Sequence, residues 1–203
     1  MRGIFEYIRT FTGRKCWPCD PRPEDICIED IAHALSLLCR FTGHVREFYS
    51  VADHSLRVAE LCSPENQLWG LLHDASEAYL ADVARPVKRN AIFGAYYKTV
   101  EKGLMKAICE KFELPEVEPP EVKEWDNILL RTEQRDLMPV EKDGPLGDND
   151  RWKDGVQPLN YKLIPRPWQE TVDLFLEQFQ HLTSKRQLRF QSGKEFYSTS
   201  LRP

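Results

Sequence analysis

The chain has 203 residues and a mass of 23.7 kDa, with 41% hydrophobic and 30% charged residues. This length fills one hydrophobic core, and this balance excludes a chain that is disordered throughout. The net charge of −4 argues against a nucleic-acid polymer as partner, and no apolar run is long enough to span a membrane. The N-terminal residues show no sustained apolar run of the kind found in signal peptides, so we expect a cytoplasmic protein, in the host cytoplasm if it is virus-encoded.

The six cysteines do not predict a disulfide framework, because the chain is not a small secreted domain. Three of them lie in helix-like apolar patterns and are interpreted as reduced core thiols: Cys39, Cys62 and Cys109. The segment Cys16-Trp-Pro-Cys19 could be a redox turn, half of a zinc site or a loop near a ligand. It has no strand–helix–strand context and no second CxxC to complete a zinc site.

Apolar residues recur with helical spacing along most of the chain, which predicts an all-α fold. The predicted helices cover approximately residues 28–39, 50–61, 63–80, 93–112, 121–137 and 168–182. Pro, Gly and Asp are frequent in 139–167, which is therefore expected to be a long loop. We expect an N-terminal extension with a loop over 1–25, one helical-bundle domain over 26–183, and a polar, basic tail over 184–203.

Capping residues predict where two of these helices start. Ser50 precedes an apolar stripe and has Asp53 three residues later, as in a weak capping box. Ser63 followed by Pro64 predicts an N-cap and a proline at the first helical position. Pro86 is expected to prevent this second helix from continuing beyond about Leu80.

Polar residues occur on the inner faces of three predicted helices. His54 lies on an apolar stripe, His73 and Asp74 follow the run Leu-Trp-Gly-Leu-Leu, and Asp126 shares a face with Val122 and Leu129. A single inward histidine is more often a hydrogen-bonded core residue than a metal ligand, and an isolated His-Asp pair is a weak motif. Two imidazoles and two carboxylates from three helices nevertheless form a suitable donor set for a divalent metal.

Further charged residues follow the His-Asp pair closely. Glu77 is expected on the same helix surface as His73 and Asp74, and Asp82 and Lys88 come soon after. Metal ligands, two carboxylates and a cation are what metal-assisted phosphate hydrolysis requires. Without the histidines, the same residues would describe a solvated helix end.

The segment from Val51-Ala-Asp-His54 through His73-Asp74-Ala-Ser-Glu77 and Asp82 to Trp125-Asp126 resembles the HD-domain metal-dependent phosphohydrolases. Within that superfamily it is most similar to the bacterial 5′-deoxynucleotidases and the phage deoxynucleoside triphosphohydrolases, and the similarity extends over about residues 26–138. The order His…His-Asp…Asp is far more specific than the dipeptide alone.

The resemblance implies an HD-type helical domain and roles for individual residues. The implied metal ligands are His54, His73, Asp74 and Asp126; the implied catalytic acids are Glu77 and Asp82; the implied substrate contacts are Lys88, Arg40 and Phe41. Arg40-Phe41 stands where the deoxynucleotidases have an Arg-Trp pair. Because phenylalanine keeps a flat ring but lacks the indole N–H, exclusion of ribonucleotides is a weaker expectation here.

These implications lead us to expect an enzyme that hydrolyses deoxynucleotide phosphates with a divalent metal such as Co²⁺, Mn²⁺, Zn²⁺ or Mg²⁺. A deoxynucleoside triphosphohydrolase, with dATP among its substrates, is the favoured expectation, and a homo-oligomer is expected from the related enzymes. A 5′-deoxynucleotidase acting on monophosphates, a silent nucleotide-binding module and a different HD-type reaction are the alternatives.

The remaining histidines and one further aspartate are less favoured site residues. His33, His44 and His181 are expected at the surface or outside the metal site. Asp136 is the rival of Asp126 for the fourth ligand position.

Overall fold

Helices account for most of the residues that the computed structural model describes, which are 6–139 and 155–199, with side chains described as far as residue 186. The all-α prediction is therefore confirmed. In chain order the elements are β1 (Ile8–Arg9), β2 (Lys15–Cys16), η1 (Pro23–Asp25), α1 (Ile28–Leu37), η2 (Arg40–Gly43), α2 (Val51–Leu61), α3 (Gln67–Leu72), α4 (Glu77–Leu80), α5 (Arg85–Lys88), α6 (Phe93–Lys111), α7 (Pro120–Leu137) and α8 (Trp168–Thr199).

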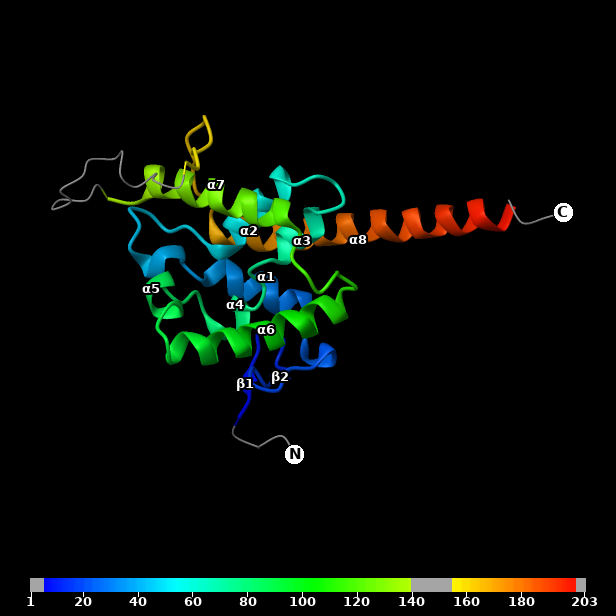
Figure 1. Cartoon of the computed structure of the whole chain (residues 1–203), viewed down its shortest axis with the longest axis horizontal. Helices are drawn as coiled ribbons and strands as arrows, with labels where there is room; N and C mark the ends of the chain where they lie inside the picture. The colour runs from blue at the N-terminus through cyan, green and yellow to red at the C-terminus, as the bar shows by residue number, and fades with distance from the viewer. Residues whose placement is uncertain (1–5, 140–154, 200–203) are drawn as a thin grey trace.

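Helix α2 lies at the centre of the bundle. It packs against α1, α3, α7 and α8, and every residue from Val51 to Leu56 is buried. In Figure 1, α6 and α7 lie on opposite sides of the body, with α1 to α4 between them. Phe175 of α8 is fully buried in the same apolar cluster as residues of α1, α2 and α3. Burying a side chain of this size contributes about 1.5–3 kcal/mol, so the last helix stabilises the layer that carries the candidate ligands.

The predicted start of α2 is confirmed. The Ser50 Oγ accepts a hydrogen bond from the Asp53 backbone N–H at 3.0 Å, which satisfies one of the free N–H groups of the first turn. The Asp53 carboxylate does not complete a capping box. It accepts hydrogen bonds from Arg57 and Arg166 instead, which ties α2 to the segment that leads into α8.

The helix predicted over 63–80 is two shorter helices, so that prediction is wrong in detail. The hydroxyl of Ser63 donates to the Glu121 carboxylate of α7 at 2.6 Å, and α3 begins only at Gln67. After α3 the chain tightens, because the Ala75 N–H bonds to the Leu72 carbonyl and the Glu77 N–H to the Asp74 carbonyl, each at 3.0 Å. These bonds span three residues rather than four, as in a 3₁₀ turn. The tighter turn aligns Asp74 and Glu77 on one side of the chain.

Other differences concern the ends of the chain and the segment after α4. The region expected as an extension over 1–25 contains a two-residue antiparallel pairing of β1 with β2. Pro86 does follow the end of α4 but lies in the first turn of the short helix α5, where proline is tolerated. Helix α8 continues to Thr199 instead of ending near Leu182. Residues 155–167 of the predicted loop contain no helix or strand, and 140–154 lie outside the described residues. Among the described residues, no helix combines the length and the apolar character needed to cross a membrane.

Candidate metal centre

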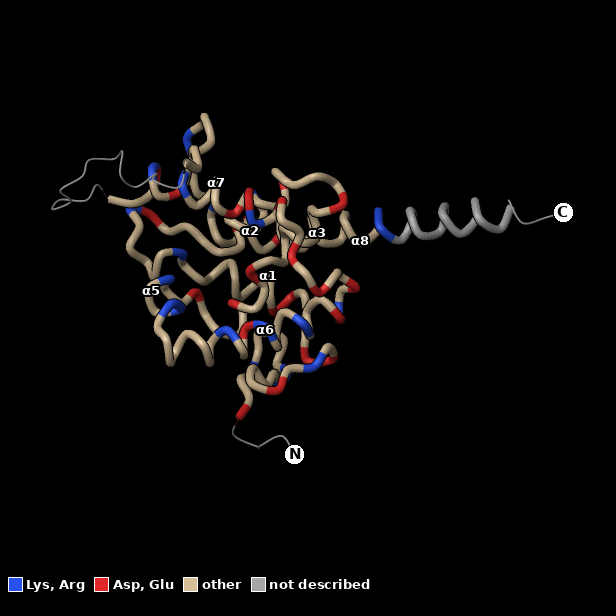
Figure 2. The backbone as a smooth tube through the Cα atoms, in the orientation of Figure 1, with Lys and Arg blue, Asp and Glu red and all other residues tan. Residues whose placement is uncertain are grey.

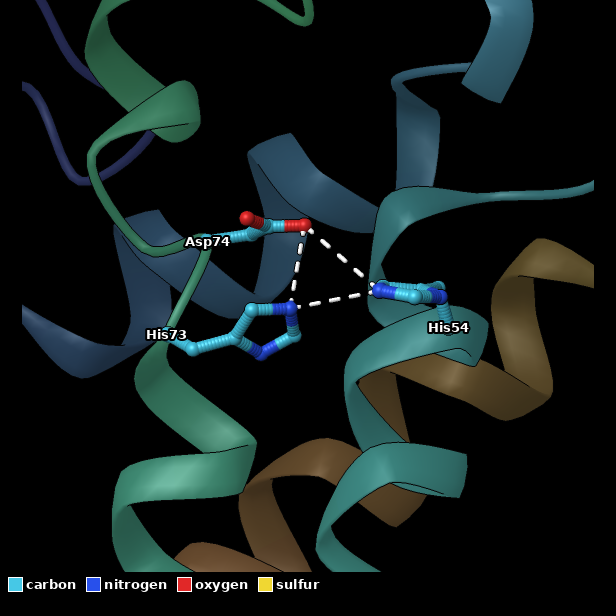
Figure 3. Close-up of side chains that lie close together, drawn as sticks. All are labelled: His54, His73 and Asp74. Atoms are coloured by element: carbon cyan, nitrogen blue, oxygen red, sulfur yellow. Dashed lines mark hydrogen bonds and ion pairs between the residues drawn. The ribbon is translucent and has the colours of Figure 1, made fainter. Parts of the chain in front are cut away.

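Three of the predicted metal ligands meet where α2 faces the tight turn after α3. Figure 3 shows His54 of α2 pointing toward His73 and Asp74 of that turn. The two histidine Nε2 atoms are 3.2 Å apart, and Asp74 Oδ2 lies 3.3 Å from His73 Nε2 and 3.7 Å from His54 Nε2. Among the residues that the structure describes, this is the only group of three or more His, Cys, Asp or Glu residues whose ligand atoms, one from each residue, all lie within 4.8 Å of one another.

Asp126, the fourth predicted ligand, lies beside this group but outside its tightest part. Its Oδ1 atom is 3.2 Å from His54 Nε2, whereas its Oδ2 accepts a hydrogen bond from Lys123 Nζ at 2.6 Å. Helix α7 buries Asp126 together with Val122 and Leu129, as the sequence predicted. One carboxylate oxygen therefore faces the histidines, and the other is held by an ammonium group.

The hydrogen-bond partners of the two imidazoles determine which nitrogen carries the proton. His73 Nδ1 lies 2.7 Å from the Gly70 carbonyl oxygen, which can only accept, so Nδ1 must be the donor. His54 Nδ1 likewise donates to the Glu133 carboxylate at 2.6 Å. In the neutral imidazoles, both Nε2 atoms thus present lone pairs toward each other and toward Asp74.

Facing lone pairs at this distance repel unless a cation lies between them. A metal at about 2.0–2.1 Å from each nitrogen, with an angle between octahedral and tetrahedral values, places the nitrogens about 2.9–3.4 Å apart. The separation of 3.2 Å fits this range. Nitrogen donors from imidazole together with carboxylate oxygens are a donor set that Zn²⁺, Mn²⁺ and Co²⁺ accept.

The charges around the histidines also favour a cation. Burial by itself lowers the pKa of His73, but the carboxylates of Asp74 and Asp126 outweigh this effect and raise it to about 9. Burial opposes ionisation of Asp74 and Asp126, yet the two imidazoles hold the pKa of both carboxyl groups well below the usual range. The group is therefore organised around positive charge, which a proton or a metal ion can supply.

Glu133 is buried on α7 like Asp126, and the sequence analysis assigned it no role. Its carboxylate is fully buried and bridges two predicted site residues, since Oε1 binds His54 Nδ1 and Oε2 binds the Arg40 guanidinium at 2.9 and 3.1 Å. Burial acts to raise the pKa of Glu133, but Arg40 and His54 lower it, so Glu133 is an anion. A second carboxylate on the face that carries Asp126, Val122 and Leu129 was the only signal in the sequence.

Arg40 and Phe41, the predicted substrate contacts, both line the cavity that opens above the histidines. Arg40 is buried, pairs with Glu133 and lies 3.5 Å from Asp74 Oδ2. Phe41 is half-buried beneath the guanidinium, with 5.5 Å between the Arg40 Cζ and the ring centre. Phe41 and Thr42 both have φ near 55°, which is unfavourable for bulky and β-branched residues and holds the ring at the cavity wall under strain.

The cavity has a volume of about 970 Å³, near the upper end of the size range of ligand sites. Both predicted acids line it, Glu77 from α4 and Asp82 from the loop that follows. Burial, together with the carboxylates of Asp74 and Asp82, raises the pKa of Glu77 to about 8, although Lys88 acts in the opposite direction. Glu77 Oε2 is buried and has no hydrogen-bond partner within the described part of the chain. The cavity therefore holds a carboxyl group that can carry a proton near neutral pH.

Lys88, the predicted phosphate contact, is held between two carboxylates. Its Nζ lies 3.0 Å from Glu77 Oε1 and 3.1 Å from Glu101 Oε1, and 5.1 Å from the centre of the Tyr97 ring. Burial opposes the charged form, but the two carboxylates raise the pKa of Lys88 further, so it stays an ammonium. Its charge is already balanced by the protein.

The other candidates from the sequence lie away from this group. The Asp136 carboxylate is bound by Arg135 and by the Leu163 N–H, so it does not replace Asp126. His33 stacks on Phe11, and His181 is exposed on α8, while His44 lines the rim of the cavity. All six cysteines are free thiols; Cys62 and Cys109 are buried as expected, whereas Cys39 is only half-buried.

Comparison with known proteins identifies relatives for this chain. No family model matches the sequence. It is 36% identical over 183 residues to the uncharacterized protein YfdR of Escherichia coli K12, and this alignment covers 89% of this chain and 97% of that protein. The chain belongs to the YfdR family. In this chain, the candidate ligands and both acids lie on the helices and turns from α2 to α7.

A second relative matches a shorter part of the chain. An uncharacterized protein of Rhodobacter capsulatus is 41% identical over 124 residues, which are 57% of this chain and 62% of that protein. Neither name states an activity. Any function of this YfdR-family chain therefore has to be argued from its own residues.

Proposed function

We propose that this protein is a divalent-metal-dependent phosphohydrolase that acts on deoxynucleotides. One observation carries the proposal: two imidazole nitrogens face each other at 3.2 Å with Asp74 and Asp126 beside them, and His73, Asp74 and Asp126 line a cavity that also contains lysine and arginine. Carboxylates and imidazoles that converge in this way suit a metal ion, and a cationic cavity suits an anionic substrate.

The residues that would hold the ion are His54, His73, Asp74 and Asp126. When bound, a divalent ion there would polarise a phosphate and lower the pKa of a water molecule. The protein itself contributes orientation, because the Gly70 carbonyl and Glu133 fix the two rings with their Nε2 atoms toward each other. Arg40 lies at the same wall, where its guanidinium balances negative charge close to Asp74.

The hydrolysis would use the two acids in different ways. The oxygen of water adds to phosphorus, the bond from phosphorus to the nucleoside O5′ breaks, and O5′ takes up a proton. Glu77 suits the proton donor, because its pKa is raised to about 8 and its Oε2 is directed away from protein hydrogen-bond partners. Asp82 lines the same cavity and suits the residue that orients the water or accepts its proton.

The substrate class rests on the resemblance to HD-domain deoxynucleotidases and triphosphohydrolases. That resemblance assigns Arg40 and Phe41 to the nucleotide. The position of both side chains at the cavity wall supports this assignment, since an aromatic ring there can pack against the sugar or the base.

The proposal is tested by product analysis with purified protein and added Co²⁺, Mn²⁺, Zn²⁺ or Mg²⁺. All four dNTPs, all four dNMPs and the matching ribonucleotides would be incubated and separated by chromatography. Asp74→Ala should abolish hydrolysis and lower the bound metal while leaving the helical circular dichroism largely intact. Asp173→Ala, an exposed aspartate on α8, is the matched control. If Asp74→Ala kept the activity of the parent protein, the proposed centre would be wrong.

A further inference from the structure

One wall of the cavity carries positive charge that the described part of the protein does not neutralise. Arg85 of α5 and Lys98 and Lys102 of α6 line the cavity and are exposed. None of the three side chains forms a hydrogen bond or an ion pair with any residue that the structure describes. Figure 2 shows lysine and arginine gathered around α5.

The other cavity cations differ from these three, because each has a partner. Lys88 pairs with Glu77 and Glu101, Lys123 pairs with Asp126, and Arg40 pairs with Glu133. Their charges are used to hold carboxylates of the site in place. The charges of Arg85, Lys98 and Lys102 are available to pair with a ligand in the cavity.

The arrangement of α6 explains why its two lysines face the cavity together. Lys98, Glu101, Lys102 and Met105 are all cavity-lining residues, with the i, i+3, i+4, i+7 spacing of one helix face. Glu101 on this face forms an ion pair with Lys88, with 3.1 Å between Lys88 Nζ and Glu101 Oε1. The two lysines, one turn apart, therefore form a short cationic strip beside Arg85.

Such a strip suits phosphate groups other than the one at the metal centre. A nucleoside monophosphate has a single phosphate, which carries about −1.5 to −2 charges, and hydrolysis requires that phosphate to lie at the histidines. A nucleotide with further phosphates places additional negative charge away from the metal centre. The cavity volume of about 970 Å³ leaves room for this extension.

We infer that the cavity takes nucleoside di- or triphosphates in preference to monophosphates, and that Arg85, Lys98 and Lys102 bind the additional phosphates. This inference rests on the proposed function for the reaction, but the cationic strip can be tested without turnover.

The experiment compares the parent protein with Lys98→Ala/Lys102→Ala. The matched control is Lys106→Ala/Lys111→Ala, which removes two exposed lysines of α6 that do not line the cavity. The kcat/KM for dATP and for dAMP is measured with the best metal. Because a charge-assisted hydrogen bond to phosphate contributes about tenfold or more, we expect the cavity variant to lose at least about tenfold more kcat/KM with dATP than with dAMP. The control should retain both values.

A binding measurement uses inorganic tripolyphosphate as the probe, by calorimetry without added metal so that chelation does not contribute. We expect the affinity to fall about tenfold or more in Lys98→Ala/Lys102→Ala and in Arg85→Ala, and the salt dependence to become weaker. Equal losses for dATP and dAMP, or unchanged tripolyphosphate affinity, would overturn the inference.

The results that would contradict the proposed function differ from those that would contradict the role of the strip. If the parent protein hydrolyses no nucleotide with any metal, the reaction is wrong, and the tripolyphosphate measurement alone decides the role of the strip. If dAMP is hydrolysed as efficiently as dATP and the cavity variant behaves like the control, the reaction stands and the strip has no such role.

Discussion

The cavity lies between two sides that differ in whether their charged side chains have partners within the described part of the protein. On the side of α2 and α7, Glu133 bridges His54 and Arg40, and the exposed Lys123 holds Asp126, so the buried charged groups on this side have partners without any ligand. On the side of α5 and α6, Arg85, Lys98 and Lys102 have no partner among the described residues.

This difference separates groups that are positioned from groups that are available. Buried charges are tolerated when they are paired and hydrogen-bonded, and the pairing fixes their geometry in advance. Exposed charges cost little when left unpaired and can pair with a ligand. Removing a paired charge should therefore reduce stability, and removing an unpaired one should reduce ligand binding.

The largest effect is expected on the paired side, from Glu133→Ala. This change leaves the buried Arg40 guanidinium without its main partner and frees His54 to rotate. Loss of one member of a buried pair costs about 3–5 kcal/mol of the free energy of unfolding. Urea denaturation of the metal-free protein measures the loss. A decrease below about 1 kcal/mol would show that the pairing does not hold this side together.

Glu133→Gln gives the matching pH test. Arg40 and His54 lower the pKa of Glu133 in the folded protein. Its contribution to stability is therefore complete above the unfolded pKa, near 4.3, and is lost as the pH falls through the folded value. The parent protein should lose stability faster than Glu133→Gln as the pH is lowered below about 4.3. Parallel stability curves for the two proteins in this range would contradict the assignment.

Metal binding should produce the next largest effect on the same side. An ion at 100 times its dissociation constant stabilises a folded protein by about 2.7 kcal/mol. We expect Zn²⁺, Mn²⁺ or Co²⁺ to raise the melting temperature and EDTA to reverse the change. His73→Ala should lose the response, whereas His181→Ala, at an exposed position on α8, should keep it. An equal response in both variants would place the ion elsewhere.

A paired and an unpaired lysine, both on the side of α5 and α6, allow the two kinds of cation to be compared directly. Lys88→Met leaves Glu77 and Glu101 without the ammonium between them, so we expect a loss of about 1–3 kcal/mol in the free energy of unfolding. Lys98→Met should change stability by less than about 0.5 kcal/mol, because it breaks no described contact. Thermal and urea denaturation of both variants measure the two changes in stability. Similar losses would remove the distinction between paired and available cations.

The smallest effect concerns the strained turn beside the cavity. Thr42 has φ near 55°, a conformation that glycine adopts without steric strain. Thr42→Gly should therefore stabilise the protein by about 0.5–1 kcal/mol. Gly43→Ala, at φ 78°, is the opposite change and should destabilise it. If Thr42→Gly destabilised the protein, the side chain would contribute contacts that outweigh the backbone strain.

Local patterns in the sequence were sufficient for the helices and for the inward side chains. The apolar stripes placed His54 and Asp126 on inner faces, and Ser50 marked the start of α2. The roles of Glu133 and Ser63 could not be predicted in this way. Glu133 acts on Arg40, 93 positions earlier in the chain, and Ser63 is engaged by Glu121, 58 positions later. Contacts over such separations depend on how the helices pack, which periodicity does not specify.

The same limit applies to Lys88 and the α6 lysines. The sequence showed that cations follow the His-Asp pair, but not that Glu101 neutralises one of them while Lys98 and Lys102 stay available. Which positive charges a ligand can reach is a property of the packed helices.

The position of α8 has a consequence for how the protein is made. All four candidate ligands lie between His54 and Asp126, whereas α8, which completes the core beneath α1, α2 and α3, begins only at Trp168. During translation, the four candidate ligands are therefore synthesised well before the helix that completes this core. An ion that binds at these residues should therefore be acquired by the finished polypeptide rather than by the growing one.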